Sequence, residues 1–192
     1  MPLVLEEGRP PLPEHLLGTL ISSGPVADIG AAERSVEAAR ARPTRAFDTL
    51  RTIPTTTRRT FVFTRSPDRL RFYVNGKLFG ENGTEATIPL GSVEEWTIRN
   101  DDNQLHNFHI HQTAFVVTAI DGVPQPILGL SDTVTVPSQI GDRPGSIMVK
   151  IAFTDPIIVG RSVFHCHVTK HEDKGMMQTI DVEPAPERGA PQ

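Results

Sequence analysis

The sequence predicts an all-β protein, a Greek-key β-sandwich preceded by an extension that is mostly irregular with one short helix. From about residue 58 onward, short runs rich in β-branched and aromatic residues alternate apolar and polar positions, as half-buried strands do. Turn-forming pairs separate these runs, among them Asn75-Gly76, which favours a tight hairpin, and Asp121-Gly122. About eight strands at this spacing indicate a sandwich or a barrel.

The elements follow in order along the chain. Residues 1–57 are rich in Pro, Ala and Arg, and we expect a linker with one short helix near residues 28–42, which Asp28 caps and Pro43 ends. Residues 58–184 are predicted to form the β-domain, and residues 185–192 a disordered tail. The strands expected in the β-domain are 60–65, 70–75, 94–99, 114–120, 132–136, 146–153, 162–166 and 177–183.

Bulk properties exclude several classes of protein. The chain has 192 residues, a formal charge of −4 and no basic cluster, so nucleic acid is not an expected partner. No apolar run approaches the ~18 residues that cross a bilayer, and the opening residues lack the layout of a signal peptide. We therefore expect neither a membrane span nor an export signal in this chain. A single cysteine cannot form an internal disulfide, so Cys166 is a buried spectator, a reactive thiol or a metal ligand.

Six of the seven histidines fall in two clusters, LHNFHIH at 105–111 and FHCHVTKH at 164–171. In an extended chain, successive side chains point to opposite faces. His109 and His111 therefore share one face, and His106 points to the other. The same parity places Cys166 opposite its two histidine neighbours. Two donor sets result: His106 with Cys166, and a second set of His109, His111, His165 and His167.

The first donor set has the composition of a blue-copper electron-transfer site. After Cys166, a turn at Gly175 can bring His171 and Met176 back over the thiolate. Two imidazoles, a thiolate and a long axial thioether are ligands that copper takes, whereas zinc has little use for a methionine. Met176 is a better axial candidate than Met177, which parity turns away if the next strand has begun. The alternative for Met176 is ordinary core packing.

The second donor set offers only imidazole nitrogens, arranged as two H-x-H pairs. Four imidazoles suit copper, zinc or nickel, and this arrangement is typical of half of a larger cluster. His165 and His167 are covalent neighbours of Cys166, so an electron arriving at the cysteine has a short through-bond route to the opposite face. The HCH sequence is therefore interpreted as a connection between a one-electron acceptor and a second copper site.

The two clusters resemble the C-terminal copper signatures of the multicopper oxidases, H-x-x-H-x-H and H-C-H-x₃-H-x₄-M. The likeness covers roughly residues 58–184, and FYVNGKLF, IPLGSVEEWTIRN, DTVTVP and IAFTDP resemble the last, type 3 plastocyanin-like cupredoxin domain of three-domain members. The resemblance implies a cupredoxin-like fold with copper as its cofactor. It implies type 1 copper at His106, Cys166, His171 and Met176, and a share in a trinuclear type 2/type 3 cluster for His109, His111, His165 and His167.

The sequence departs from this family pattern at two points. Asn107 stands where many members have proline, a change that we expect to be tolerated. A trinuclear cluster of this family takes eight histidines, and this chain offers four, because the remaining His15 stands alone and is interpreted as a solvated linker residue. The resemblance therefore implies that an N-terminal cupredoxin domain or another chain, which could be a second copy in a homo-oligomer, supplies the other half.

The resemblance implies a laccase-like oxidoreductase. A small reductant such as a phenol, an aromatic amine or Cu(I) would give electrons near His171, and Cys166, His165 and His167 would pass them on for the reduction of O₂ to water. It also implies a periplasmic or extracellular location. A second function class stays open: a stand-alone type 1 copper electron carrier or copper-binding module without oxidase activity. Chance clustering of histidines around a buried thiol would require both the spacing and the parity to be accidental.

Three acidic residues near the clusters also have two interpretations. Glu172 and Asp173 could orient His171 or help bind a cationic substrate, or they could form a solvated turn. Asp132 could accept a hydrogen bond from a ligand, although a turn residue at a strand start is the plainer interpretation.

Overall fold

The computed structural model describes residues 30, 50, 52–81, 83–126 and 129–184. The chain divides into two compact units, Met1–Pro43 and Thr44–Gln192, and the fold below is that of the second unit. The helix expected near residues 28–42 lies outside the described residues except for Gly30, and the expected tail, 185–192, lies wholly outside them. Among the described residues, no helix is long and apolar enough to cross a membrane.

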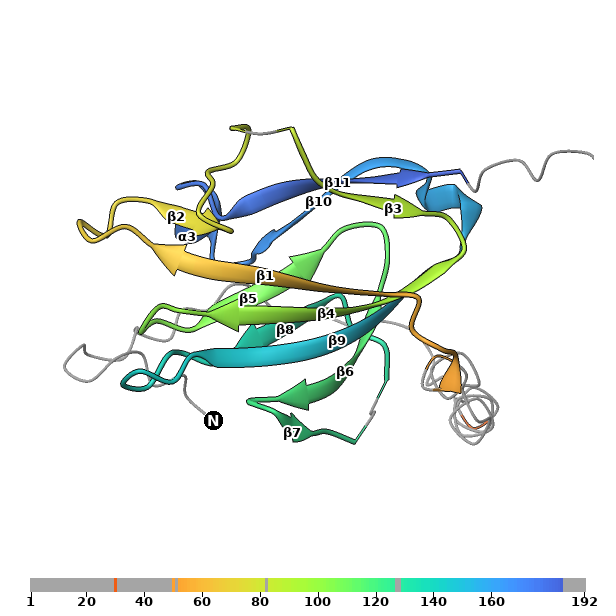
Figure 1. Cartoon of the computed structure of the whole chain (residues 1–192), viewed down its shortest axis with the longest axis horizontal. Helices are drawn as coiled ribbons and strands as arrows, with labels where there is room; N and C mark the ends of the chain where they lie inside the picture. The colour runs from red at the N-terminus through yellow and green to blue at the C-terminus, as the bar shows by residue number, and fades with distance from the viewer. Residues whose placement is uncertain (1–29, 31–49, 51, 82, 127–128, 185–192) are drawn as a thin grey trace, which may run out of the picture. The chain divides into compact units, whose positions relative to one another are not determined.

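The strands form two sheets that face each other as layers (Figure 1). The first sheet has the order β2-β1-β4-β9-β6-β7, and the second has the order β3-β11-β10-β5-β8. The first contains β1 (Thr57–Arg65), β2 (Phe72–Val74), β4 (Ser92–Asn100), β6 (Phe115–Ile120), β7 (Val123–Pro124) and β9 (Gly145–Phe153). The second contains β3 (Thr84–Pro89), β5 (His106–Ile110), β8 (Thr133–Val136), β10 (Gly160–Cys166) and β11 (Met177–Glu183). A 3-10 turn, Pro156–Ile158, precedes β10, and the short helix α3, Thr169–Glu172, follows it.

The predicted all-β sandwich is confirmed, and each of the eight expected strands has a counterpart. The Asn75-Gly76 turn is also confirmed: both residues have positive φ, and Val74 and Lys77 exchange backbone hydrogen bonds across it. Three strands were not predicted as such, β3, β5 and β7, although the parity argument treats the LHNFHIH cluster of β5 as extended. The strand β3 lies at the edge of the second sheet and ends in Pro89, a residue that sheets accept on edge strands but that weakens a strand prediction from the sequence.

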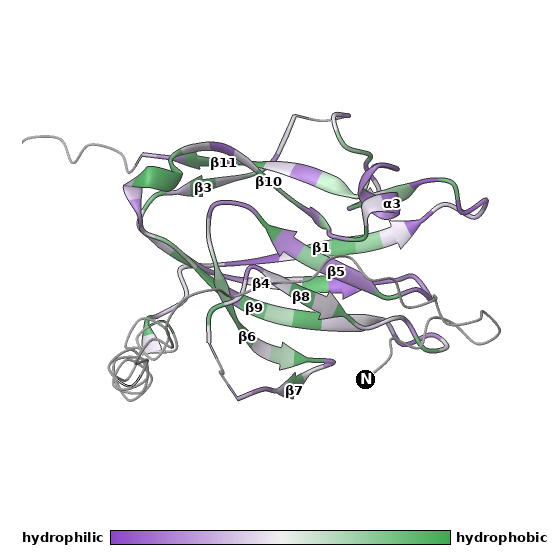
Figure 2. Cartoon of the chain, turned by 180° about the vertical axis from the view of Figure 1, so that it is seen from behind, coloured by the Kyte–Doolittle hydropathy of each residue, from purple (hydrophilic) through white to green (hydrophobic). Residues whose placement is uncertain are grey.

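The core lies between the sheets and is built around Trp96 of β4, which is fully buried. Its ring lies 4.8 Å from Phe61, 5.7 Å from Phe153 and 5.6 Å from Phe164, measured between ring centroids. Figure 2 shows apolar residues along the strands and hydrophilic residues in the loops around α3. Cys166 and Met176 belong to this same buried cluster, so the apolar core extends directly to the first donor set.

The segment before β1 also packs on the β-domain. Leu50 is buried and Ile53 partly so, and both lie against Val93 and Val116 on the outer face of the first sheet. These two residues fall in the region that the sequence assigns to the linker. They cover outward-facing apolar side chains that would otherwise meet water.

One carboxylate is buried inside the sandwich. Glu94 is fully buried, and it accepts hydrogen bonds from the indole N–H of Trp96 at 2.7 Å and from Arg59 at 2.7 and 2.9 Å. Arg59 also donates to the carbonyl of Thr87 in β3, so its guanidinium joins the two sheets. A buried charge is tolerated only when it is paired and hydrogen-bonded, as this one is.

Replacing Arg59 by methionine is therefore expected to lower the free energy of unfolding by about 3 kcal/mol, because Glu94 keeps only the Trp96 donor. Urea denaturation of the metal-free chain measures this difference. Arg58→Met is the matched control, since the Arg58 side chain is 74% exposed in its pair with Glu95 and should cost under about 1 kcal/mol. Equal losses in the two variants would contradict the assignment.

Candidate metal centres

The pairing of β5 with β10 brings the two histidine clusters together. The two strands are antiparallel neighbours in the second sheet, with His109 opposite His165 and Phe108 opposite Cys166. In β5, His106 and Phe108 face the core and His109 faces away, and in β10 the core face carries Cys166. The alternation expected from the sequence is thus present in both strands, and it separates the two donor sets.

The first donor set is buried beside the core. The Nδ1 atoms of His106 and His171 lie 3.0 Å apart, and each lies 3.6 Å from the Cys166 sulfur. His106 and Cys166 are fully buried, and His171 is 8% exposed. The Phe72 ring stacks on His171 with centroids 4.1 Å apart, which fixes one side of that imidazole. His171 belongs to the helix α3, which follows β10 and contacts it.

These three donors fit a single metal ion. With bonds of about 2.0–2.1 Å, as zinc makes to imidazole, two nitrogens that share an ion at roughly 95–120° lie about 3.0–3.6 Å apart. The separation of 3.0 Å between His106 and His171 lies in this range. A thiolate with two imidazoles in a dry, apolar setting is the composition that copper prefers.

Burial controls the protonation of this set in the metal-free protein. Burial and the neighbouring His171 lower the pKa of His106 to about 4, and burial also lowers the pKa of His171. Burial raises the pKa of the Cys166 thiol, while backbone N–H groups of Asn107 and Val168 oppose that rise. At neutral pH the set therefore offers neutral imidazoles, and an incoming ion must displace the thiol proton.

The backbone of Met176 is hydrogen-bonded to two residues of the first donor set, Cys166 and His171. Its backbone carbonyl accepts the N–H of Cys166 at 3.0 Å, and its own N–H donates to the carbonyl of His171 at 3.1 Å. The Met176 side chain is fully buried, whereas Met177 is partly exposed at the start of β11. Gly175 makes the turn with a φ of +110°, and a Cβ there would lie 2.4 Å from the Leu78 side chain. The backbone of Met176 therefore lies next to Cys166 and His171 and its side chain is buried, whereas Met177 is partly exposed; the axial role of Met176 stays a prediction.

Asn107 contributes a contact that proline could not make. Its backbone N–H donates to the Cys166 sulfur at 3.4 Å, and its carbonyl accepts the N–H of His167 at 2.7 Å. Because this N–H points to the sulfur instead of to a neighbouring strand, a proline here would leave the β-ladder intact. Asparagine is thus accommodated, and it adds one hydrogen-bond donor at the sulfur.

The second donor set lies on the opposite face of the same two strands. Donor atoms of His109, His111 and His165 all lie within 4.8 Å of one another, and the Nε2 atoms of His111 and His165 are 3.0 Å apart. The ring of His167 lies 5.1 Å from that of His109 and stacks at 5.6 Å on that of His165, between centroids. His111 and His167 are exposed, so this set opens to the surface.

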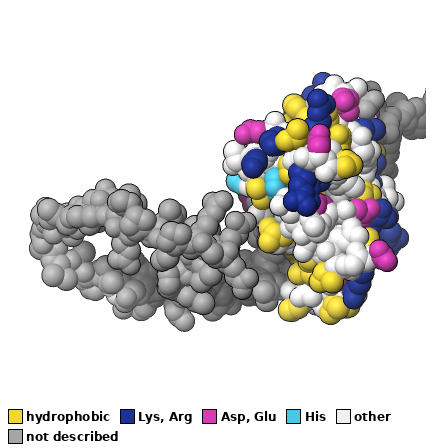
Figure 3. All heavy atoms as spheres, turned by 90° about the vertical axis from the view of Figure 1, so that its left-hand side faces the viewer, with side chains coloured by type: hydrophobic (Ala, Val, Ile, Leu, Met, Phe, Trp, Pro, Cys, Tyr) yellow, Lys and Arg dark blue, Asp and Glu magenta, His cyan; other side chains and the backbone are white. Residues whose placement is uncertain are grey.

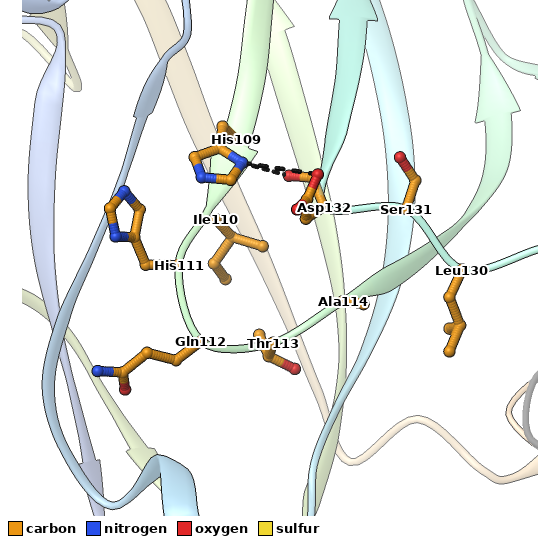
Figure 4. A pocket seen from close by; sticks show the side chains of 9 residues that line it. All are labelled: His109, Ile110, His111, Gln112, Thr113, Ala114, Leu130, Ser131 and Asp132. Carbon is orange, nitrogen blue, oxygen red and sulfur yellow. Dashed lines mark hydrogen bonds and ion pairs between the residues drawn. The ribbon is translucent and has the colours of Figure 1, made fainter. Parts of the chain in front are cut away.

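Neighbouring groups orient two of these imidazoles. The Nδ1 of His109 lies 2.9 Å from the carbonyl of Asp132 (Figure 4). It also lies 2.9 Å from the hydroxyl of Thr133. The Asp132 carboxylate is 3.9 Å away, so the backbone of this residue is the closer acceptor. The Nδ1 of His165 lies 3.3 Å from the Glu172 carboxylate. Holding Nδ1 in this way leaves Nε2 free for a metal.

The position of Glu172 differs from both interpretations of the sequence. Its carboxylate contacts His165 of the second set and not its neighbour His171, because α3 turns the Glu172 side chain toward the outer face. Asp173 is exposed. An open hollow of about 820 Å³ adjoins the second set, bordered by His109, His111, Thr113, Leu130 and Asp132 (Figure 4). Histidine side chains reach the surface among lysines and arginines at the end that carries β2 and α3 (Figure 3).

Three residues near the two donor sets were not predicted from the sequence. Thr133 follows Asp132 on β8, and its hydroxyl faces His109. Asp102 lies four residues before His106, with its carboxylate 3.4 Å from the Nε2 of that histidine. Arg65 contacts Asp102 from β1 at 2.9 Å. The spacing between Asp102 and His106 was visible in the sequence, but the contact with Arg65 depends on the sheet topology.

A two-sheet β-sandwich with a buried cysteine and two imidazoles at one end defines a copper protein of the cupredoxin class. A family model for multicopper oxidases matches residues 48–186, and the chain belongs to that family. It is 34% identical over 116 residues to "Multicopper oxidase mco" of Staphylococcus haemolyticus and 34% identical over 115 residues to a "Laccase" of Haloferax volcanii. Each alignment covers 57% of this chain, but only 24% and 19% of the respective relative.

Solved structures of multicopper oxidases share the fold of this chain. A multi-copper oxidase from Pediococcus acidilactici superposes with a TM-score of 0.59 and 25% identity, over 73% of this chain and 29% of that one. The multicopper oxidase of Campylobacter jejuni superposes with a TM-score of 0.57 at 22% identity, which shows the shared fold. The chain thus spans about a quarter of the length of the curated relatives that it matches.

Proposed function

We propose that this chain forms the electron-accepting domain of a laccase-like oxidase and half of its oxygen-reducing site. Copper, when bound, supplies the one-electron chemistry by which four electrons and four protons convert O₂ to two waters. His106, Cys166, His171 and Met176 would hold a type 1 copper. The second set, His109, His111, His165 and His167, would hold part of a trinuclear cluster.

The observation that carries this proposal is the placement of the two donor sets on opposite faces of one strand end. Cys166 turns its sulfur to the buried set, while His165 and His167, each one peptide bond away, belong to the outer set. The backbone therefore gives electrons a covalent path between the sets. A reductant needs only to reach the surface near His171, so phenols, aromatic amines and Cu(I) all suit this arrangement.

The outer set supports a partner that contributes further histidines. It presents four imidazoles to one side, two of them exposed, next to an open hollow. An N-terminal cupredoxin domain is the partner that the family offers, and a second copy of this chain would bring the same number of imidazoles. By family membership, we propose a periplasmic or extracellular site of action.

Native mass spectrometry of the copper-loaded chain tests the proposal, because it reads copper content and assembly mass together. We expect one copper on the 21.1 kDa monomer, and further copper only in an assembly that completes the outer set. Further copper in a dimer of this chain would identify a second copy as the partner. A monomer that takes up no copper would refute the proposed type 1 site.

Met176→Leu provides a test of the axial ligand. Thioether donation favours Cu(II), so its loss is expected to raise the reduction potential of the bound copper, by roughly the 59 mV that corresponds to a tenfold change in a one-electron equilibrium. A redox titration followed by visible absorption measures the shift. Met177→Leu is the matched control and should leave the potential unchanged. An unchanged or lowered potential in Met176→Leu would rule out the axial role.

A further inference from the structure

The loop between β4 and β5 places a buried carboxylate against the remote nitrogen of His106. The Nδ1 atom of His106 faces Cys166 and His171, and its Nε2 lies 3.4 Å from the Oδ2 of Asp102. Asp102 is 5% exposed and His106 is fully buried. These two atoms have no hydrogen-bond partner among the described residues, so each is the polar group that the other faces. The imidazole is thus held between the donor set and a carboxylate.

The other oxygen of Asp102 is held from β1, the neighbour of β4 in the first sheet. Arg65, the last residue of β1, lies 2.9 Å from the Oδ1 of Asp102, and its side chain is only 10% exposed. Arg65 also donates to the side chain of Asn103, and the N–H of Gln104 approaches Oδ1 at 3.4 Å. The arginine therefore fixes the carboxylate and offsets part of its charge. Arg65, Asp102 and His106 form a continuous line of contacts that ends at the first donor set.

We propose that Arg65 and Asp102 are positioning residues that set the reduction potential of the copper held at His106, with opposite signs. This inference rests on the type 1 copper site of the proposed function. Neither residue is a ligand, and both act through the His106 ring. Asp102 sets the orientation and donor strength of the imidazole, and Arg65 limits how much negative charge Asp102 delivers.

The signs follow from the charges. A carboxylate that accepts the Nε2–H of a ligand histidine strengthens the donor nitrogen at the other side of the ring. A stronger donor favours Cu(II) over Cu(I), so Asp102 lowers the reduction potential. Arg65 draws charge from Asp102 and weakens this effect, so it raises the potential. Both groups are shielded from water, so their charges act with little screening.

The experiment is a redox titration of the Cu(II)-loaded full chain, followed by its visible absorption. Asp102→Asn is expected to shift the one-electron equilibrium about tenfold toward Cu(I), which corresponds to an increase of about 59 mV. Arg65→Gln is expected to shift it toward Cu(II). In the double variant, the Arg65 substitution should have a smaller effect than it has alone, since its route through Asp102 is gone.

Two further variants control for charge and for folding. Arg99→Gln removes an exposed arginine that is paired bidentately with Asp101 in the same loop region, and it should leave the potential unchanged. Arg65→Lys keeps the positive charge, so its reduction potential should stay close to that of the wild type. This variant still tests the role of the charge if Arg65→Gln does not fold.

The outcomes separate the two levels of the proposal. If the wild-type chain develops no thiolate-to-copper absorption, the type 1 site is wrong and this inference falls with it. If the absorption develops but Asp102→Asn and Arg65→Gln shift the potential in the same direction, the two residues only support the loop and the inference is overturned. Opposite shifts, in variants that still develop the thiolate-to-copper absorption, would establish it.

Discussion

Cys166→Ser is expected to abolish the visible absorption of the copper-loaded chain and its ability to accept electrons from a reductant. The sulfur is the one soft anionic donor of the buried set, and serine supplies neither its charge at neutral pH nor its bonding to copper. The fold should persist, because Ser is nearly the same size. A buried hydroxyl in place of the thiol costs about 1–3 kcal/mol if it finds no partner. Visible absorption, copper content and thermal unfolding report these three effects separately.

His165 and His167 provide the control within the same variant. Both side chains remain on the outer face in Cys166→Ser, and the ladder of β10 with β5 does not involve the sulfur. We therefore expect any copper that the outer set binds to be retained. If the serine variant kept the intense absorption, the thiolate would not be a copper ligand and the buried set would need another role.

The parity of the two histidine clusters could be predicted because it depends only on strand alternation. Once LHNFHIH and FHCHVTKH are extended, His106 and Cys166 must point away from His109 and His165, and the structure has this arrangement. What could not be predicted was whether the two clusters meet. That follows from the pairing of β5 with β10, two strands whose paired residues lie more than fifty positions apart in the sequence.

The contacts around the donor sets were harder to predict for the same reason. Glu172 is adjacent in sequence to His171, yet its carboxylate reaches His165, because neighbouring side chains on a helix point about 100° apart. Arg65 meets Asp102 only through the order of strands in the first sheet. Sequence spacing identifies donors on one strand, whereas the groups that orient them come from other elements.

Replacing both His109 and His111 by glutamine is expected to abolish oxygen reduction while the buried copper site keeps its electron-accepting function. Both imidazoles belong to the outer set, and neither contacts the Cys166 sulfur. O₂ consumption by an assembly containing this chain should fall by more than about 100-fold, because loss of an outer hydrogen-bond partner alone costs 10–100-fold. The visible absorption and reduction potential of the buried copper should stay unchanged. An oxygen electrode and a redox titration on the same preparation measure the two quantities.

The double variant distinguishes an oxidase domain from an electron carrier. A carrier uses only the buried copper, so it would pass electrons to an external acceptor at the wild-type rate with both histidines replaced. An oxidase would have the wild-type colour before reductant is added, then lose it and stay reduced, because the reduced copper would have no acceptor on the outer face. Gln112→Asn is the matched control, since this neighbouring residue borders the hollow but offers no imidazole. Full O₂ consumption by the double variant would exclude the outer set from oxygen chemistry and leave the carrier as the function of this chain.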